Sequence, residues 1–124
     1  MANSTVLVVD DDPWIVQSVS DILSDAGYTV AAAQSALEAA RQVAHSPAAL
    51  VLLDIRLPGL DGKQFAIDLR ARHITSKILV MTASHNAHEL AAEIGADGLL
   101  EKPFDLTDLL SEVERLCPPT PDGL

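Results

Sequence analysis

Five side chains able to take part in phosphoryl or metal chemistry follow short apolar segments of this 124-residue chain. Three are carboxylates, one is a hydroxyl and one is an ammonium: Asp10, Asp11, Asp54, Thr82 and Lys102. Carboxylate oxygens together with water suit a hard cation such as Mg²⁺, with Mn²⁺ as an alternative. An ionised Asp can also attack phosphorus and form an acyl phosphate. A lysine and a hydroxyl would then stabilise the phosphoryl oxygens.

The segments that precede these side chains have the composition of buried β-strands. Val, Ile and Leu dominate three of them, which is typical of parallel strands covered on both faces. The run at 28–33 is weaker and is expected at an edge of the sheet. The five expected strands are 5–9, 28–33, 49–54, 77–82 and 97–101.

Amphipathic segments separate the expected strands. Apolar residues recur at helical spacing over 16–23 and 106–116. Asp12, which precedes a proline, and Asp105 have the residue type preferred at a helix N-cap, and Gly27 is a typical stop. The other three helices are expected at 36–44, 63–72 and 87–94.

Five alternating strand–helix units predict an α/β domain with a (βα)5 doubly wound parallel sheet in the order 2-1-3-4-5. Ligands bind at the carboxyl ends of the strands in such sheets. Asp54 is then one strand, about 5 Å, from the Asp10 and Asp11 pair and from Thr82. Lys102 starts two strands from Asp54, but its long stem can bring the ammonium back. The order therefore predicts one pocket.

Composition narrows the class of protein. Acids outnumber Lys plus Arg by 18 to 8, which argues against direct nucleic-acid binding and favours cations or basic partners. The single cysteine, Cys117, fits a reducing compartment. The chain shows no signal peptide and no apolar run long enough to span a bilayer. We therefore expect a soluble cytoplasmic protein without membrane contact.

Four motifs occur in a particular order: VLVVDDDP (6–13), VLLDIRLPGLDG (51–62), VMTAS (80–84) and LLEKPF (99–104). Together they resemble the receiver domain of two-component response regulators, a chemotaxis-receiver-like family with a flavodoxin-like fold. The resemblance implies that Asp54 is the phosphoacceptor and that Asp10 and Asp11 hold Mg²⁺ together with Asp54. It also implies that the backbone carbonyl of Arg56 is a metal ligand.

The resemblance further implies a partner and a switch. A sensor histidine kinase or a histidine phosphotransfer protein would donate the phosphoryl group to Asp54. Thr82 matches the switch hydroxyl, and Lys102 matches the lysine that precedes a cis proline. Arg56 and Ser84 match positions that tune the rate of hydrolysis. At Leu99 the family usually has Tyr or Phe, so the aromatic half of the usual switch cannot operate here.

Simpler interpretations apply to other residues. Asp12 is expected to be a cap rather than a metal ligand, and Trp14 to pack or lie partly exposed. Cys117 precedes two prolines and is expected at a frayed, inert helix end. The four histidines do not form a convincing metal set, and His85 and His88 are expected at solvated positions: the four are His45, His73, His85 and His88.

Three functions remain open at this stage. The first is a phosphoacceptor domain over 1–117, with 118–124 as a tail or the start of a linker and a homodimer as one option. The second is a haloacid dehalogenase-like phosphatase using Asp10, although the sequence DDDPW lacks the fifth residue of its motif. The third is a degenerate receiver that only binds partners, which Leu99 keeps open.

Overall fold

The computed structural model describes residues 5–55, 62–72, 74–83 and 85–118. Five strands alternate with five helices along this part of the chain. The strands are β1 (Thr5–Val9), β2 (Thr29–Ala33), β3 (Leu50–Asp54), β4 (Lys77–Thr82) and β5 (Gly98–Glu101). The helices are α1 (Pro13–Asp25), α2 (Ala36–His45), α3 (Gly62–Ala71), α4 (Ala87–Ile94) and α5 (Leu106–Leu116). The expected elements are confirmed, with bounds that differ by one residue where they differ.

The strands form one parallel sheet in the order β2-β1-β3-β4-β5, which confirms the predicted topology. The weaker second strand lies at an edge, as its composition indicated. Every residue of β3 is buried because this strand lies in the middle of the sheet and is covered on both faces. The pairing also aligns the strand ends, since Val9 lies opposite Leu53 and Asp54 opposite Met81.

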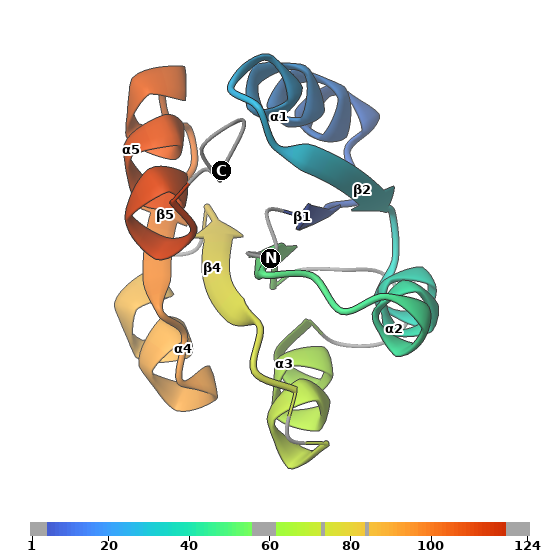
Figure 1. Ribbon diagram of the computed structural model, residues 1–124. Coiled ribbons are helices and arrows are strands. Elements are labelled where there is room, and N and C mark those ends of the chain that lie inside the picture. The colour runs from blue at the N-terminus through green and yellow to red at the C-terminus, as the bar shows by residue number, and fades with distance from the viewer. Residues whose placement is uncertain (1–4, 56–61, 73, 84, 119–124) are drawn as a thin grey trace.

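Helices cover both faces of the sheet (Figure 1). Alternate strand residues point to opposite faces, so the buried side chains divide into two clusters. One cluster contains Val6, Val8, Leu50 and Leu52 of the strands and packs against α1 and α5. The other contains strand residues of opposite parity and packs against α2, α3 and α4: Leu7, Val9, Val51, Leu53, Ile78 and Val80.

Among the described residues, side-chain caps begin α1, α2 and α5. Asp12 accepts a hydrogen bond from the backbone N–H of Trp14 at 2.9 Å, and Pro13 follows it as the first helical residue. Asp105 accepts from the backbone N–H of Asp108 at 3.0 Å. Both caps confirm the sequence prediction, and the cap at Asp12 fixes where α1 leaves the end of β1.

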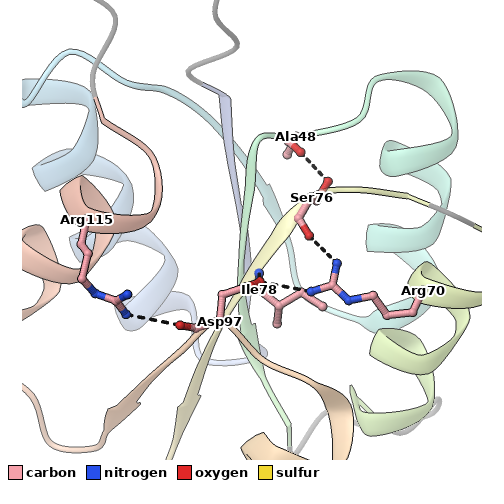
Figure 2. Close-up of polar contacts among 6 residues, drawn as sticks. All are labelled: Ala48, Arg70, Ser76, Ile78, Asp97 and Arg115. Carbon is pink, nitrogen blue, oxygen red and sulfur yellow. Dashed lines mark hydrogen bonds and ion pairs between the residues drawn. The ribbon is translucent and has the colours of Figure 1, made fainter.

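Asp97 lies at the centre of a polar network at the amino-terminal end of β4 and β5 (Figure 2). Its Oδ2 accepts from the backbone N–H of Ile78 at 2.8 Å and lies 3.1 Å from Arg70 Nη2. Arg70 Nη1 also donates to the carbonyl of Ser76 at 2.8 Å, and Arg115 donates to the carbonyl of Asp97 at 3.3 Å. Side chains from α3 and α5 are thereby tied to this end of the sheet.

Two expectations about single residues are wrong. Trp14 is 80% exposed because it lies on the outer face of α1. The same face carries exposed polar residues: Gln17, Ser18 and Asp21. The inner face of the helix carries the buried Val19 and Leu23. Cys117 is buried rather than frayed, since the Tyr28 hydroxyl donates to its carbonyl at 2.6 Å.

The other expectations for α4 and the tail have separate outcomes. His88 lies on α4 with an 87% exposed side chain, and His85 is exposed just before that helix, as expected. Pro118 is exposed, and residues 119–124 of the predicted tail lie outside the described residues. No helix in the described ranges is both long enough and apolar enough to cross a membrane.

Candidate functional site

Asp10 is the first residue after β1 and is fully buried. Its backbone N–H donates to the carbonyl of Ala33 at 3.1 Å, so the chain is still held against β2 at this point. Its Oδ1 accepts from the backbone N–H of Asp12 at 2.9 Å. This turn bond was missed from the sequence, although an Asp followed two residues later by a helix cap is a recognisable signal for it.

Lys102 connects the two buried carboxylates. Its Nζ lies 2.7 Å from Asp10 Oδ2 and 3.3 Å from Asp54 Oδ2, with hydrogen-bond geometry to both. The expected reach of the lysine across the strand between it and Asp54 is therefore confirmed. The side chains are 0% exposed for Asp10, 9% for Asp54 and 20% for Lys102, so this ion pair is largely shielded from solvent screening.

The environment of Lys102 favours its charged form. Burial by itself would lower the pKa of the ammonium, but the hydrogen bond that Lys102 donates to Asp10 and the negative charges of Asp54 and Asp10 outweigh burial. The net result is a raised pKa. Lys102 is thus a fixed positive charge at the carboxyl ends of the strands at neutral pH.

Asp10, Asp11 and Asp54 form the one group of His, Cys, Asp or Glu side chains in the described ranges that could share an ion. One ligand atom from each lies within 4.8 Å of the others. Asp11 is exposed, whereas Asp10 and Asp54 are buried, so the group opens to solvent on the Asp11 side. Three carboxylates with room for water are a donor set that fits Mg²⁺ or Mn²⁺.

Thr82 is buried at the end of β4, on the strand next to Asp54. Its carbonyl accepts from the backbone N–H of Lys102 at 2.9 Å, which continues the pairing of β4 and β5 beyond the last strand residue. The next peptide bond, Lys102–Pro103, is cis, as the resemblance implied. The structure therefore places Thr82 and Lys102 at adjacent strand ends.

Leu99 lies on β5 and is half-buried. It packs against the cluster on the α4 side of the sheet, alongside the partly buried Leu90 and Ala96. Its position therefore has a local packing role. Arg56 and Ser84, the other two sequence-predicted site positions, lie outside the described residues.

An apolar groove adjoins the site and was missed in the sequence. It has a volume of about 460 Å³ and lies between the start of α1 and the β5–α5 connection. Trp14, Phe104 and Leu106 line it, and Lys102 also belongs to its lining. Leu106 is 44% exposed, so two large apolar side chains stand at the surface beside the carboxylates. The single tryptophan of the chain, Trp14, was the sequence feature that could have indicated this groove.

Comparison with known proteins shows which family the chain belongs to. The family model for the response regulator receiver domain matches residues 6–114. The chain belongs to this family. Receiver domains are signalling domains of two-component systems, so the chain is assigned a signalling role consistent with phosphoryl acceptance.

Three similar proteins illustrate the match. The response regulator MprA of Mycobacterium sp. strain KMS is 39% identical over 113 residues, which cover 90% of this chain and 49% of that relative. The Vibrio cholerae chemotaxis protein CheY4 has a TM-score of 0.85 and 32% identity, covering 93% of this chain and 99% of that chain. NtrX of Brucella abortus gives a TM-score of 0.84 and 32% identity, covering 94% of this receiver and 27% of NtrX.

The chain spans about half the length of the curated response regulators that it matches. In those relatives, the similar region is therefore one part of a longer protein. The similarity covers the receiver domain, so it does not indicate which process the protein regulates.

Proposed function

We propose that Asp54 accepts a phosphoryl group from a phosphohistidine of a sensor histidine kinase or a histidine phosphotransfer protein. The single observation that carries this proposal is the contact of Lys102 Nζ with both Asp10 and Asp54 beside the Asp10, Asp11 and Asp54 group. A cation fixed next to a strand-end carboxylate is what an incoming phosphoryl group requires. The receiver family match supports the same assignment.

In the proposed step, one carboxylate oxygen of Asp54 forms a bond to phosphorus. The bond between phosphorus and the donor imidazole nitrogen breaks, and its electron pair returns to that nitrogen. A carboxylate oxygen of Asp54 would act as the nucleophile, and the Lys102 ammonium lies 3.3 Å away. Lys102 would then contact the phosphoryl oxygens, and the Thr82 hydroxyl would donate a hydrogen bond to one of them.

Asp10, Asp11 and Asp54 would hold Mg²⁺ or Mn²⁺, with the backbone carbonyl of Arg56 as a further ligand. When bound, the ion would neutralise the three carboxylates and the phosphoryl oxygens. Asp10 is buried and already held by Lys102 and by the N–H of Asp12, whereas Asp11 is exposed. Asp11 is therefore the ligand with the greater freedom to adjust to the ion.

We propose that the conformational response to phosphorylation of Asp54 starts at Thr82. Arg56 and Ser84 would tune the lifetime of the phosphoryl group. Leu99 has no aromatic ring that could change its rotamer together with the Thr82 hydroxyl. Any conformational change would therefore be transmitted through side-chain packing on the α4 side of the sheet. A cytoplasmic location belongs to this proposal, supported by the single Cys117, which fits a reducing compartment.

Acetyl phosphate tests the proposal directly. The intact mass of the protein should rise by one phosphoryl group after incubation with Mg²⁺ and acetyl phosphate, and chelation of the metal should abolish the rise. Asp54→Asn should remain unlabelled, whereas Asp68→Asn, on α3, serves as a matched control that should label normally.

Two results would contradict the proposal. No labelling from acetyl phosphate, phosphoramidate or a phosphohistidine protein would indicate a degenerate receiver that only binds partners. Steady turnover of a phosphate ester that depends on Asp10 rather than Asp54 would indicate a phosphatase.

A further inference from the structure

A small groove lies between α2 and α3, on the face of the sheet opposite to α1 and α5. Figure 1 shows α2 and α3 as neighbouring helices, and both pack on the same core cluster. The buried Phe65 and Leu69 of α3 line the groove, and the exposed Leu37 of α2 lines it at the surface. Its volume is about 180 Å³, which suits one large apolar side chain rather than a complete small-molecule ligand. We call it the α2–α3 groove.

Positive charge is concentrated in the two helices that form this groove. The segments 36–45 and 62–72 carry four of the eight Lys and Arg residues of the chain but two of its eighteen acids. The chain as a whole has a net charge of -10, so the remaining segments are strongly acidic. An anionic segment of a partner would therefore be repelled by most of the surface and directed toward the α2–α3 groove.

Two arginines of these segments are available to a partner. Arg72 is exposed and lines the groove, and Arg41 is exposed on α2, one turn after Leu37. Within the described ranges, neither arginine forms an ion pair, whereas Arg70 is paired with Asp97. A guanidinium without an acidic neighbour can bind a carboxylate of another protein through two parallel hydrogen bonds.

The two acids of the same segments form local hydrogen bonds. Asp68, the one acid among the described residues that line the groove, accepts from Gln64 Nε2 at 3.0 Å. Glu38 accepts from the backbone N–H of Gln34 at 3.3 Å, ahead of α2. Neither acid forms an ion pair with an arginine in the described part of the chain. The groove therefore combines an apolar floor with an unpaired cation in its lining.

Charge also decides between a second copy of the chain and another protein. A symmetric contact between two copies would place Arg41 and Arg72 of one copy against the same arginines of the other. A head-to-tail contact with an acidic face would form a ring or an open filament and would bring together two chains of net charge -10. A short acidic segment of another protein meets neither obstacle.

We propose that the α2–α3 groove docks a segment of a partner protein, with an apolar side chain inserted against Leu37 and a neighbouring carboxylate bound to Arg72. Arg72 follows the last residue of α3 and precedes β4. The acidic part of the segment would therefore bind toward the amino-terminal ends of the strands, whereas Asp54 lies at a carboxyl end. This inference goes beyond the phosphoacceptor function, because it names a second surface and a partner distinct from the phosphodonor.

Two pairs of matched variants test the groove. Arg72→Gln removes the cation that lines it, and Lys77→Gln removes an exposed cation outside its lining. Leu37→Ala and Ile67→Ala make the same comparison for exposed apolar side chains, since Leu37 lines the groove and Ile67 does not. The probe is a fluorescent peptide of leucine and glutamate with both ends capped, measured against the unphosphorylated full chain by fluorescence anisotropy.

Arg72→Gln and Leu37→Ala should each weaken binding of the peptide by about fivefold, because the first loses a charge-assisted hydrogen bond and the second an apolar contact. Lys77→Gln and Ile67→Ala should bind with nearly the parent affinity. A matched peptide with glutamine in place of glutamate should bind more weakly and should not distinguish Arg72→Gln from the parent protein. Backbone amide signals of α2 and α3 should shift in NMR spectra on addition of the glutamate peptide.

Four outcomes would overturn the inference. The first is no binding of the glutamate peptide to the parent protein. Equal weakening in Arg72→Gln and Lys77→Gln would mean attraction to charge in general, and NMR shifts confined to other elements would place the peptide elsewhere. Concentration-dependent self-association that Arg72→Gln abolishes would make a second copy the occupant. Acetyl phosphate labelling of Asp54 is measured separately in every variant, so failure of the groove and failure of the phosphoacceptor site are distinguishable.

Discussion

Lys102 Nζ lies 2.7 Å from Asp10 Oδ2, which is closer than its 3.3 Å contact with Asp54 Oδ2. The lysine thus stabilises the most deeply buried carboxylate of the site while remaining within reach of the proposed phosphoacceptor. Because Asp10 is fully buried, its charge would be costly without a partner. The same side chain therefore supports the fold and is positioned for the chemistry.

Replacing Lys102 with Met should reveal both roles. The variant keeps most of the aliphatic stem but leaves buried Asp10 without its cation, so the metal-free protein should lose about 2 kcal/mol of unfolding free energy. Added Mg²⁺ should restore part of this loss, because the ion would provide a replacement charge. Urea unfolding with chelator and with Mg²⁺ measures both effects. The control Lys77→Met, at an exposed position, should change neither the metal-free unfolding free energy nor its response to Mg²⁺. An equal loss of unfolding free energy in this control would contradict the role assigned to the ion pair of Lys102 with Asp10.

Asp11→Asn should have opposite effects in the two metal states. Removing one of three neighbouring carboxylates relieves repulsion, so the metal-free protein should gain about 0.5 kcal/mol. The same change should weaken Mg²⁺ binding by about tenfold or more, because a charged ligand is lost. Titration of Trp14 fluorescence with Mg²⁺ and thermal unfolding report the two quantities. Asp21→Asn on α1 is the control, and a loss of metal-free stability in Asp11→Asn would contradict this account.

Much of the fold and the position of the site follow from local features of the sequence. The near-continuous apolar run at Leu50–Asp54 can only be buried in the middle of a sheet, and alternation with amphipathic segments predicts parallel pairing. Once the strand order is known, Asp10, Asp54 and Thr82 have to lie at neighbouring strand ends. That is why the predicted pocket agrees with the structure.

Contacts between residues far apart in sequence could not be predicted in the same way. The burial of Cys117 depends on Tyr28, which is 89 positions away, and nothing near either residue indicates the contact. Whether the Lys102 ammonium lies closer to Asp10 or to Asp54 depends on differences of less than about 1 Å in side-chain position. Likewise, the sequence predicts Asp97 only as the start of the strand 97–101, and its contacts with Ile78 and Arg70 depend on how β4 and α3 lie in the fold.

Titration of Tyr28, the single tyrosine, should show how firmly α5 is held. Burial, together with the nearby Cys117 and Glu114, raises its pKa from 10.0 to about 12. Its contribution to stability is therefore complete below pH 10 and is lost as pH rises toward 12. Lys102, whose pKa is also raised, acts in the same direction above 10.5. Ultraviolet absorbance should show tyrosinate forming near pH 12 in the native protein and near pH 10 in urea.

Tyr28→Phe provides the matched variant for that titration. It keeps the buried ring but removes the donor to the Cys117 carbonyl, so it should lose about 1 kcal/mol of unfolding free energy. The fall in stability between pH 10 and pH 12 should also become shallower than in the parent protein. A native tyrosine that titrates near pH 10 would show that the hydroxyl is not buried against α5.

Asp97→Ala should lower stability without affecting phosphorylation. The substitution leaves the Ile78 N–H without its acceptor and removes the carboxylate from Arg70, which keeps its bond to the Ser76 carbonyl, at a cost of about 2 kcal/mol. Asp97→Asn keeps one acceptor oxygen and should cost less. Acetyl phosphate labelling at Asp54 should stay at the parent rate in both variants, because the network lies at the opposite ends of the strands. Slower labelling in folded Asp97→Ala would instead connect the two ends of the sheet.

Trp14→Ala should separate a protein donor from a small-molecule donor. Trp14 is 80% exposed, so its removal should change the unfolding free energy by no more than about 0.5 kcal/mol. It lines the apolar groove that Lys102 also lines, so a phosphohistidine protein that covers the site has to pass over it. Transfer from such a protein should slow by about tenfold or more, as expected when a large apolar anchor is lost from an interface.

Labelling by acetyl phosphate, which needs no docking surface, should keep the parent rate in the same variant. Leu37→Ala removes a 53% exposed apolar side chain from α2, on the other face of the sheet, and should leave both donors unaffected. If Trp14→Ala slowed the two donors equally, Trp14 would be acting on the site itself, and if it slowed neither, the apolar groove would not be where the donor protein docks.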